Sequence, residues 1–571
     1  MAAAQEWPAA SMAQVRDTLC APGARFEMET VMIEGVPTRV WKNAHPDLTA
    51  LARHARGHGQ TLFTIHEDER VSYDAWFRAT AALACHLLRL GVRPGDRVAI
   101  AMRNLPEWPV AFFAGASLGA ILVPLNGWWT GPELAYGLEN SGASVLICDA
   151  ERWERIGAHR EALPALRHVL VSRAGDRTLD PAARLEDVIG TPHAYRALPD
   201  QDLPAVSLKP DDPVTIFYTS GTTGRPKGAL GTHRNMLTNI LSTAYGQARA
   251  MVRRGEPYPP AQMVRDIGLL VIPLFHVTAC NARMIGAMQA GHTLIFMRKW
   301  DTVQAFEIIE RERVTSAGGV PTIAWQLLEH PERDKYDLSS LRSVAYGGAP
   351  AAPELARQIK QVFGAWPGNG WGMTETSATV SSISAEDYLL RPDSCGAPVP
   401  VADVKVMTPD GKTEVPVGEV GELWARGPQV LRHYWNNIPA TADTFTQGWV
   451  RTGDLGRVDA EGFCYILDRA KDVIIRGGEN IYSIEIEDVL YDHPAVMDAA
   501  VVPRAHRTLG EEPVAVVQVT PGADVTEADL QAWVRDRLAA FKIPVSIRIQ
   551  EDGLPRNANG KILKKDLKAL F

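Results

Sequence analysis

The chain has 571 residues, a formal net charge of −8 and 46% hydrophobic residues, which is an ordinary globular composition. Its length excludes a small disulfide-stapled or fibrous protein. It corresponds to about four domains, or to one large multi-lobed region with a small appendage. The mildly acidic balance provides no overall positive field for a nucleic acid backbone, so a polyanionic ligand would need a local site. Nucleic acid is therefore not an expected partner.

The six cysteines lie far apart and show neither the spacing of a zinc knuckle nor a Cys-x-x-C pair. This distribution is typical of reduced cysteines in a protein core. The first residues lack a basic stretch followed by an unbroken apolar run, so no secretory signal is expected. Together these features predict a cytoplasmic protein.

An uncharged run at 108–132 has the length of a transmembrane helix. Prolines and glycines interrupt this run, however, and divide it into a short helix over 109–118 and a buried strand over 120–125. The sequence therefore predicts no transmembrane segment. It leaves peripheral membrane contact and oligomerisation open.

A βα rhythm begins near residue 72. Ser72 is placed to cap a helix over 73–90, Gly91 ends it, and an apolar strand follows at 97–102. Further apolar segments alternate with helical stretches and are predicted as strands at 144–148, 168–171, 267–272 and 292–296. This alternation predicts layered α/β subdomains with largely parallel sheets.

The pattern changes twice in the last third of the chain. Short strands with Pro and Gly turns indicate a β-rich subdomain over about 390–468. A boundary near 468–471 is followed by predicted helices and strands at 483–491, 498–502, 513–519 and 526–541. We therefore expect a large N-terminal domain over 1–468 and a small, mobile α+β C-terminal domain over 469–571.

The strongest local signal is YTSGTTGRPKG at 218–228, which follows the strand-like residues 214–217. Small hydroxyls and glycines let backbone N–H groups approach a polyphosphate, and Lys227 adds a positive charge. It is not a Walker A loop, because Lys227 is followed by Gly228 and not by Ser or Thr. The predicted phosphate-binding residues are Thr219, Ser220, Gly221, Thr222, Thr223, Gly224 and Lys227.

This segment resembles the phosphate-binding signature of the adenylate-forming superfamily, which includes acyl-CoA synthetases, peptide-synthetase adenylation domains and beetle luciferases. Other segments resemble the family in the same order over nearly the whole chain. PLFH at 273–276 resembles the segment whose histidine, here His276, helps to shape the carboxylate site. YGGAP at 346–350 resembles the segment against which adenine lies, which implies Gly348, Ala349 and Pro350.

GWGMTET at 370–376 resembles the motif that places a threonine on the α-phosphate and a glutamate on Mg²⁺. A carboxylate is the ligand that this hard cation requires. The resemblance implies Thr374 and Glu375 in these roles, with Thr219 as a second metal-site residue. It also implies nucleotide contacts from Gly370, Trp371 and Gly372, where Trp371 replaces the commoner tyrosine.

The C-terminal third carries the remaining family segments. TGD at 452–454 resembles the motif whose aspartate, here Asp454, accepts hydrogen bonds from the ribose, and Arg469 matches an arginine that also reaches the ribose. Lys471 stands at the family's domain hinge. The resemblance further implies that Gly477 and Gly478 let the pantetheine arm of coenzyme A pass, and that PRNANGKI at 555–562 carries the adenylation lysine, Lys561.

The resemblance implies a two-step ligase reaction. A carboxylate attacks the α-phosphorus of ATP in the presence of Mg²⁺, and a thiol then displaces AMP from the acyl-adenylate. Only ten residues follow Lys561, with no carrier-protein segment, so free coenzyme A is the expected acceptor and another thiol the alternative. A non-catalytic acyl- or nucleotide-binding protein is a more distant alternative.

The identity of the acid is a separate question. Phe275 is followed by His276, where amino-acid-activating relatives commonly have Asp, so an amino acid is disfavoured. The small residues at 277–280 and 318–322 resemble fatty-acyl members and favour a medium- or long-chain fatty acid. An aryl acid is the alternative.

Overall fold

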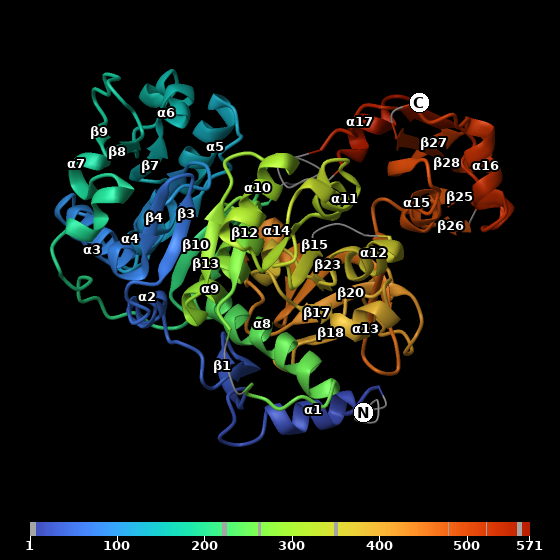
Figure 1. Cartoon of the computed structure of the whole chain (residues 1–571), viewed down its shortest axis with the longest axis horizontal. Coiled ribbons are helices and arrows are strands. Elements are labelled where there is room, and N and C mark those ends of the chain that lie inside the picture. Colours follow the sequence, from blue (N-terminus) through green and yellow to red (C-terminus); the bar gives the residue numbers. More distant parts are fainter. Residues whose placement is uncertain are drawn as a thin grey trace.

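The computed structural model describes residues 7–219, 225–260, 264–347, 352–477, 479–520, 522–556 and 562–571. It has the expected α/β class, with a large N-terminal unit and a smaller C-terminal unit, which is drawn in red in Figure 1. Two large sheets form the centre of the N-terminal unit.

The first sheet has eight strands in the order β21-β11-β10-β6-β5-β7-β8-β9. Its strands from β10 to β9 are parallel, as predicted, and β11 and β21 add an antiparallel edge. The strands are β5 (Arg97–Ala101), β6 (Ile121–Pro124), β7 (Val145–Asp149), β8 (His168–Ser172), β9 (Ala183–Arg184), β10 (Pro213–Tyr218), β11 (Gly228–Thr232) and β21 (His433–Tyr434).

The second sheet has nine strands in the order β18-β17-β16-β15-β14-β12-β13-β3-β4. Because β16, β15, β14, β12, β13 and β3 are parallel, their carboxyl ends meet at one edge. The strands are β3 (Leu62–His66), β4 (Glu69–Ser72), β12 (Ile267–Leu270), β13 (Thr293–Phe296), β14 (Ser316–Gly319), β15 (Ser343–Gly347), β16 (Trp366–Trp371), β17 (Ser381–Ser384) and β18 (Ala397–Pro398).

Helices cover these sheets (Figure 1). The α-helices of the N-terminal unit are α1 (Met12–Leu19), α2 (Leu48–Arg56), α3 (Tyr73–Arg89), α4 (Glu107–Ala116), α5 (Gly131–Ser141), α6 (Ala150–Gly157), α7 (Glu186–Ile189), α8 (His233–Arg253), α9 (Ile285–Ala290), α10 (Thr302–Glu312), α11 (Pro321–Glu329), α12 (Pro353–Phe363), α13 (Ala385–Leu390) and α14 (Ile438–Thr444). A π-helix, η3 (Thr278–Met284), leads into α9. Short 3₁₀ turns are η1 (Arg160–Ala162), η2 (Pro192–Ala197), η4 (Arg333–Lys335), η5 (Thr374–Thr376) and, in the C-terminal unit, η6 (Ala540–Lys542).

Helix α3 begins where the sequence predicts. The side chain of Ser72 accepts a hydrogen bond from the backbone N–H of Ala75 and caps the helix. The uncharged run at 108–132 folds into most of α4 and all of β6, whose residues are buried in the core. Within the described ranges, no helix is long and apolar enough to cross a membrane.

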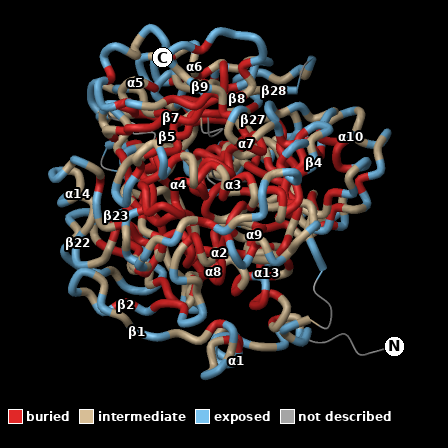
Figure 2. Tube along the Cα trace, turned by 90° about the vertical axis from the view of Figure 1, so that its left-hand side faces the viewer, coloured by how far each residue is buried: buried red, intermediate tan, exposed pale blue. Residues whose placement is uncertain are grey.

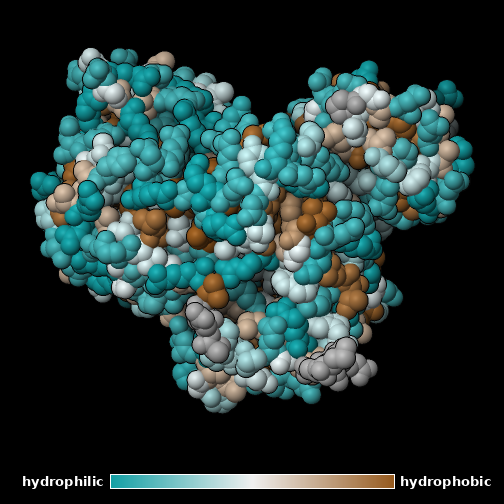
Figure 3. All heavy atoms as spheres, in the orientation of Figure 1, coloured by the Kyte–Doolittle hydropathy of each residue, from teal (hydrophilic) through white to brown (hydrophobic). Residues whose placement is uncertain are grey.

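The largest core cluster lies beneath α3 and α4, where buried residues drawn in red in Figure 2 are concentrated. The rings of Trp108 and Phe112 stack with centroids 5.1 Å apart, and Trp76 meets Phe113 edge-on at 5.3 Å. Such aromatic packing adds to the free energy gained by burying these large side chains. On the face drawn in Figure 3, the surface is mainly hydrophilic and hydrophobic residues show as separate spots.

Two small antiparallel sheets complete the N-terminal unit. β1 (Met28–Ile33) pairs with β2 (Val36–Trp41) in the first of these sheets. Five further strands form the second of them, in the region 390–468 where strands and turns are predicted. These are β19 (Asp403–Met407), β20 (Gly421–Arg426), β22 (Phe445–Thr446), β23 (Trp449–Val458) and β24 (Cys464–Arg469). The pairing of β23 with β24 places Asp454 directly opposite Arg469.

The C-terminal unit is a five-stranded sheet with helices packed on it. Its elements are β25 (Ile474–Arg476), β26 (Glu479–Ile481), α15 (Ser483–Tyr491), β27 (Val496–His506), β28 (Gly510–Val519), α16 (Glu527–Arg535), β29 (Ile547–Gln550) and α17 (Lys564–Lys568). Thr526 and Asp529 form a capping box at the start of α16, as that sequence predicts. The helix ends at Arg535, so Leu538 and Phe541 pack against the core from the segment after it and not from its apolar face.

Candidate active site

A cavity of about 730 Å³ lies at the carboxyl ends of the parallel strands of the nine-stranded sheet. Val271 follows β12, Met297 follows β13, Val320 follows β14 and Gly347 ends β15, and all four residues line the cavity. This edge is where open α/β sheets usually bind their ligands. Residues from the eight-stranded sheet, the β-rich strands and the C-terminal unit complete the wall.

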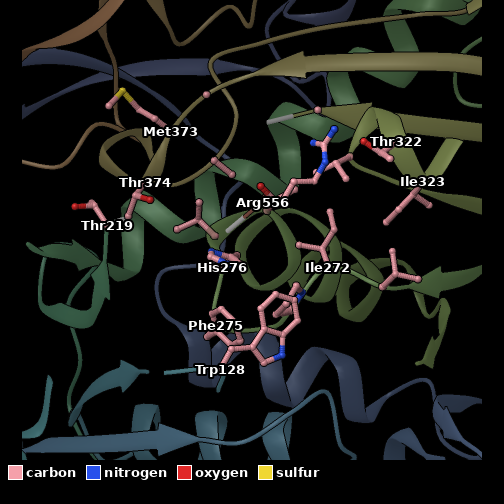
Figure 4. Close-up of a pocket in the computed structure, with 18 of the residues that line it drawn as sticks. Trp128, Thr219, Ile272, Phe275, His276, Thr322, Ile323, Met373, Thr374 and Arg556 are labelled. Atoms are coloured by element: carbon pink, nitrogen blue, oxygen red, sulfur yellow. The ribbon is translucent and has the colours of Figure 1, made fainter. Parts of the chain in front are cut away.

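Figure 4 shows the arrangement of the cavity wall. Thr219 and Thr374 lie on one side, and Thr322 and Ile323 lie on the opposite side, with His276 between them. Thr219 and Thr374, whose hydroxyls suit a phosphate, therefore lie at the opposite end of the cavity from Ile323.

The structure brings together many of the predicted site residues. Those that line the cavity are Thr219, Lys227, His276, Gly372, Thr374, Glu375, Arg469 and Lys471. Gly370, Trp371 and Asp454 stand just behind this wall, whereas Gly477 is not among the lining residues. The predicted residues outside the described ranges are Ser220, Gly221, Thr222, Thr223, Gly224, Gly348, Ala349, Pro350, Gly478 and Lys561.

The two ends of the predicted phosphate loop are fixed by β10 and β11. Tyr218 pairs with Gly228, and the backbone N–H of Thr219 donates to the carbonyl of Lys227 at 2.9 Å. The ammonium group of Lys227 lies 5.0 Å from the ring centroid of Tyr434 in β21. This cation–π contact holds the lysine at the cavity wall.

Tyr434 also contacts the candidate metal ligand. Its hydroxyl donates to Oε1 of Glu375 at 2.5 Å, and Glu375 is only 6% exposed. Burial and the adjacent charge of Glu375 raise the pKa of Tyr434, so the phenol stays protonated as the donor. Tyr434 is not predicted from the sequence, because nothing in its local pattern places a two-residue edge strand beside Glu375.

The loop that carries Thr374 and Glu375 is tightly constrained. A Cβ on Gly372 would lie 1.4 Å from the carbonyl oxygen of Ala378, so only glycine fits there. Ser377 has a φ of +50°, and its carbonyl accepts a hydrogen bond from Nδ2 of Asn239 in α8 at 2.7 Å. The same amide accepts from the N–H of Thr379 at 2.9 Å. Asn239, which no local sequence pattern singles out, therefore fixes the far end of this loop.

Asp454 is held by two neighbours. Nε1 of Trp371 donates to its Oδ2 at 2.8 Å, and Nε of Arg469 lies 2.7 Å from its Oδ1. Asp454 is buried, and a buried carboxylate requires such partners. Each oxygen keeps a lone pair, which suits the two hydroxyls of a ribose.

His276 presents an uncharged imidazole. Its Nε2 is inaccessible to solvent and has no hydrogen-bond partner among the described residues. Burial lowers the pKa of His276 to about 3, so the ring is neutral at physiological pH. The Phe275 ring, 4.6 Å away, packs against it, and Trp128 meets Phe275 edge-on at 6.2 Å. A neutral imidazole can hydrogen-bond a carboxylate substrate without forming a salt bridge.

The C-terminal unit contributes to the cavity through Arg556, which is labelled in Figure 4 and also pairs with Asp498. Lys471 lines the cavity between the two units. Burial and the positive charges of Arg469 and Lys564 lower the pKa of Lys471, although Asp472 opposes them. The predicted hinge residue thus lies where the two units meet.

The side chains of the cavity that could bind a metal suit Mg²⁺ that arrives with a nucleotide better than a metal ion held by protein ligands alone. No group of three or more His, Cys, Asp or Glu side chains in the described part of the chain is placed to hold a metal ion. Glu375 is the one carboxylate among the described lining residues. Mg²⁺ commonly binds through one or two carboxylates and the phosphates of its substrate.

The chain is similar to known proteins in both sequence and structure. A profile of the AMP-binding enzyme family matches residues 41–435, and a profile of the AMP-binding enzyme C-terminal domain matches residues 485–561. The chain is 36% identical over 519 residues to a feruloyl-CoA synthase of an Amycolatopsis species, covering 91% of this chain and 98% of that protein. It is 34% identical over 506 residues to 4-coumarate–CoA ligase 2 of Oryza sativa subsp. japonica, covering 86% and 85%.

A solved structure of the anthranilate CoA ligase AuaEII in complex with anthranoyl-AMP superposes with a TM-score of 0.81. It is 26% identical, and the match covers 92% of this chain and 97% of that chain.

Proposed function

The chain belongs to the AMP-binding enzyme family as an ATP-dependent acid–coenzyme A ligase that acts through an acyl-adenylate, and we propose that its substrate is an aryl acid of the hydroxycinnamate type. The observation that carries this proposal is the 36% identity to a feruloyl-CoA synthase over 98% of that protein. The aromatic and branched side chains of the cavity support it. Phe275, Trp128, Ile272 and Ile323 provide flat and apolar surfaces for a ring.

The relatives favour an aryl acid over the fatty acid that we expected first. That expectation rested on small residues, and their packing argues against it. A Cβ on Gly318 would lie 1.8 Å from the carbonyl oxygen of Ala345, and one on Gly319 would lie 2.8 Å from Cδ1 of Ile323. Ala279 and Cys280 are buried in the π-helix and do not line the cavity. Gly318 and Gly319 are small because a neighbouring strand and a side chain approach them closely, so their size is not by itself a sign of space for a long chain.

In the first step, the acid carboxylate would lie near His276 and attack the α-phosphorus of ATP. The catalytic requirement is positioning and charge stabilisation, with no covalent enzyme nucleophile. We assign the phosphates to Thr219, Lys227 and the loop between them, the α-phosphate to Thr374, and the ribose to Asp454 and Arg469. Mg²⁺ at Glu375, with Thr219 nearby, would neutralise charge on the phosphates when bound.

In the second step, the coenzyme A thiol would displace AMP. We propose that the C-terminal unit supplies Lys561 for adenylation and then rotates about Lys471, so that Gly477 and Gly478 line the path of the pantetheine arm. One cavity would thereby serve two reactions. In the present arrangement Lys471 lines this cavity, and so does Arg556, which lies five residues before Lys561 in the sequence.

The test is a substrate panel. Purified protein with ATP and Mg²⁺ is given ferulic, 4-coumaric, anthranilic, decanoic or palmitic acid, with and without coenzyme A, and products are identified by mass spectrometry. We expect AMP and an aryl-CoA, with kcat/KM at least about tenfold above that for either fatty acid. A preference for a fatty acid would overturn the choice of acid, and ADP or no turnover would overturn the ligase. An aryl-adenylate that persists with coenzyme A present would point to another thiol acceptor.

A matched pair of variants tests the acyl side of the cavity. Ile323→Trp adds bulk opposite Thr219 and should raise the KM for the acid without changing the KM for ATP. Ile438→Trp changes an 84% exposed residue of α14 and should leave both constants unchanged.

A further inference from the structure

A polar network crosses from the last strand of the N-terminal unit into the C-terminal unit. Asp468, in β24, is 1% exposed. Its Oδ2 accepts hydrogen bonds from the backbone N–H of Ser483 at 2.5 Å and from the Ser483 hydroxyl at 2.9 Å. Ser483 is fully buried and begins α15. The carboxylate therefore lies at the N-terminal end of that helix, where a negative charge is stabilised.

Lys564 of α17 extends the network. Its ammonium group donates to the Ser483 hydroxyl at 2.6 Å and lies 2.7 Å from Oε1 of Glu487. The Ser483 hydroxyl thus accepts from Lys564 while it donates to Asp468, which uses both capacities of the group. Glu487 is in turn fixed by the N–H of Val501 at 2.7 Å.

The electrostatics of the network favour a charged lysine. Burial alone would lower the pKa of Lys564, but the charges of Glu487 and Asp468 outweigh it and raise this pKa. Burial raises the pKa of both Asp468 and Glu487. The two carboxylates and the ammonium therefore depend on one another for charge compensation.

The network spans the predicted hinge. Asp468 pairs with Leu455 in the β-rich sheet of the N-terminal unit and lies three residues before Lys471. Its partners Ser483 and Lys564 belong to the C-terminal unit. A rotation about Lys471 would carry Ser483 away and leave the carboxylate of Asp468 without two of its donors. Because the buried carboxylate would lose these hydrogen bonds, the rotated arrangement has the higher free energy and the present arrangement is the more stable one.

We propose that Asp468, Ser483 and Lys564 form an interdomain latch that stabilises the arrangement in which Arg556 lines the cavity, and that Lys564 is a positioning residue for adenylation. The latch rests on the proposed two-step function. It acts through the orientation of the C-terminal unit, and Lys564 itself does not line the cavity. Release of the latch would accompany the change to thiolation.

The half-reactions test this proposal. Adenylation is followed by acid-dependent ATP–pyrophosphate exchange, and thiolation by conversion of supplied acyl-adenylate with coenzyme A. We expect Ser483→Ala and Lys564→Met to slow adenylation about tenfold while thiolation is unchanged or faster, because each change removes an interaction with the carboxylate of Asp468 that only the latched state makes. Ser483→Ala removes the hydrogen bond from the hydroxyl, and Lys564→Met removes the nearby positive charge. Lys564→Arg should keep most of the adenylation rate. Lys565→Met, an exposed neighbour on α17, is the control and should change neither rate.

Backbone hydrogen exchange provides a second measurement that needs no substrate. The Ser483 amide should exchange about tenfold faster in Lys564→Met than in Lys565→Met. If wild type turned over no acid but this difference appeared, the proposed function would fail and the latch would stand. Equal losses in both half-reactions, or equal exchange in the two lysine variants, would overturn the latch. Should Lys564→Met fail to fold, Ser483→Ala, which keeps the lysine, decides between these outcomes through the ratio of the half-reactions.

Discussion

The indole of Trp371 and the carboxylate of Asp454 are joined by a hydrogen bond of 2.8 Å. The indole of Trp371 gives this chain an N–H donor behind the predicted ribose site. With Arg469 on the other oxygen, the bond fixes the plane of the carboxylate before any nucleotide binds. Preorganisation of this kind lowers the cost of binding.

Trp371→Phe should therefore weaken nucleotide binding. The change keeps an aromatic ring but leaves Oδ2 of the buried Asp454 without its donor, and a hydrogen bond to a charged group contributes about 1.5–3 kcal/mol. We expect the KM for ATP to rise about tenfold or more, with a smaller change in kcat. Trp366→Phe, in the same strand but packed against Lys360, is the control. An unchanged KM for ATP would show that Asp454 needs no help from the indole.

Tyr434→Phe tests the contact with Glu375. The hydroxyl donates at 2.5 Å to a carboxylate that is almost wholly buried, so its removal takes this donor away from Oε1 of Glu375. We expect acyl-adenylate formation to slow about tenfold, and half-maximal activity to require more Mg²⁺, because Glu375 is no longer held in place. The measurement is pyrophosphate exchange over a series of Mg²⁺ concentrations.

The matched control for Tyr434→Phe is Tyr336→Phe, which alters a ring packed on Phe306 far from Glu375 in the chain. If Tyr434→Phe behaved like this control at every Mg²⁺ concentration, Tyr434 would have no role at the metal site.

Local sequence patterns predicted much of the fold because they act within single elements. Ser72 caps α3 through a residue three positions away, and the interrupted run at 108–132 divides into α4 and β6 near Gly119, which has a φ of +71°. The motifs at 273–276, 346–350 and 370–376 come together because they lie at the carboxyl ends of β12, β15 and β16, which are parallel strands of one sheet. Their order in the sequence therefore carries information about their position in space.

Contacts between distant segments could not be predicted in this way. Asn239 lies in the middle of α8, yet its amide bonds Ser377, 138 residues later, and holds the loop of Glu375. Gly318 is one of the small residues that favoured a fatty acid in the sequence, but its missing Cβ makes room for the backbone of Ala345. In both cases the residue has its role because of a neighbour in space, Ser377 for Asn239 and Ala345 for Gly318. These neighbours depend on the order of strands in the sheet and on helix packing, which a local sequence pattern does not predict.

His276 should make the protein sensitive to acid. Its pKa is lowered to about 3 in the folded chain, against about 6.5 for an unperturbed histidine. Below pH 6.5 the unfolded chain therefore binds a proton that the folded chain excludes, so stability falls as the pH falls towards 3. The slope is up to about 1.4 kcal/mol per pH unit for this one group.

The corresponding measurement is the free energy of unfolding in urea at pH 7 and pH 5. Wild type should lose up to about 2 kcal/mol more over this interval than His276→Asn, which has no imidazole to protonate. His193→Asn removes an exposed histidine and should follow wild type. Identical pH profiles for wild type and His276→Asn would mean that the imidazole is already accessible to protons in the folded chain.

Lys561→Ala should separate the two steps of the reaction. An ammonium group that stabilises developing charge in the adenylation transition state contributes several kcal/mol, so its loss should slow pyrophosphate exchange by about 10²–10³-fold. Thiolation breaks the acyl–phosphate bond after the C-terminal unit has rotated and, in the proposed mechanism, Lys561 has left the site, so thiolation of supplied acyl-adenylate should continue at a rate close to wild type. Lys568→Ala, in the same C-terminal stretch, serves as the control for both rates. Equal loss of the two half-reactions in Lys561→Ala would remove the adenylation role from this lysine, and would imply instead that it supports the fold of the C-terminal unit.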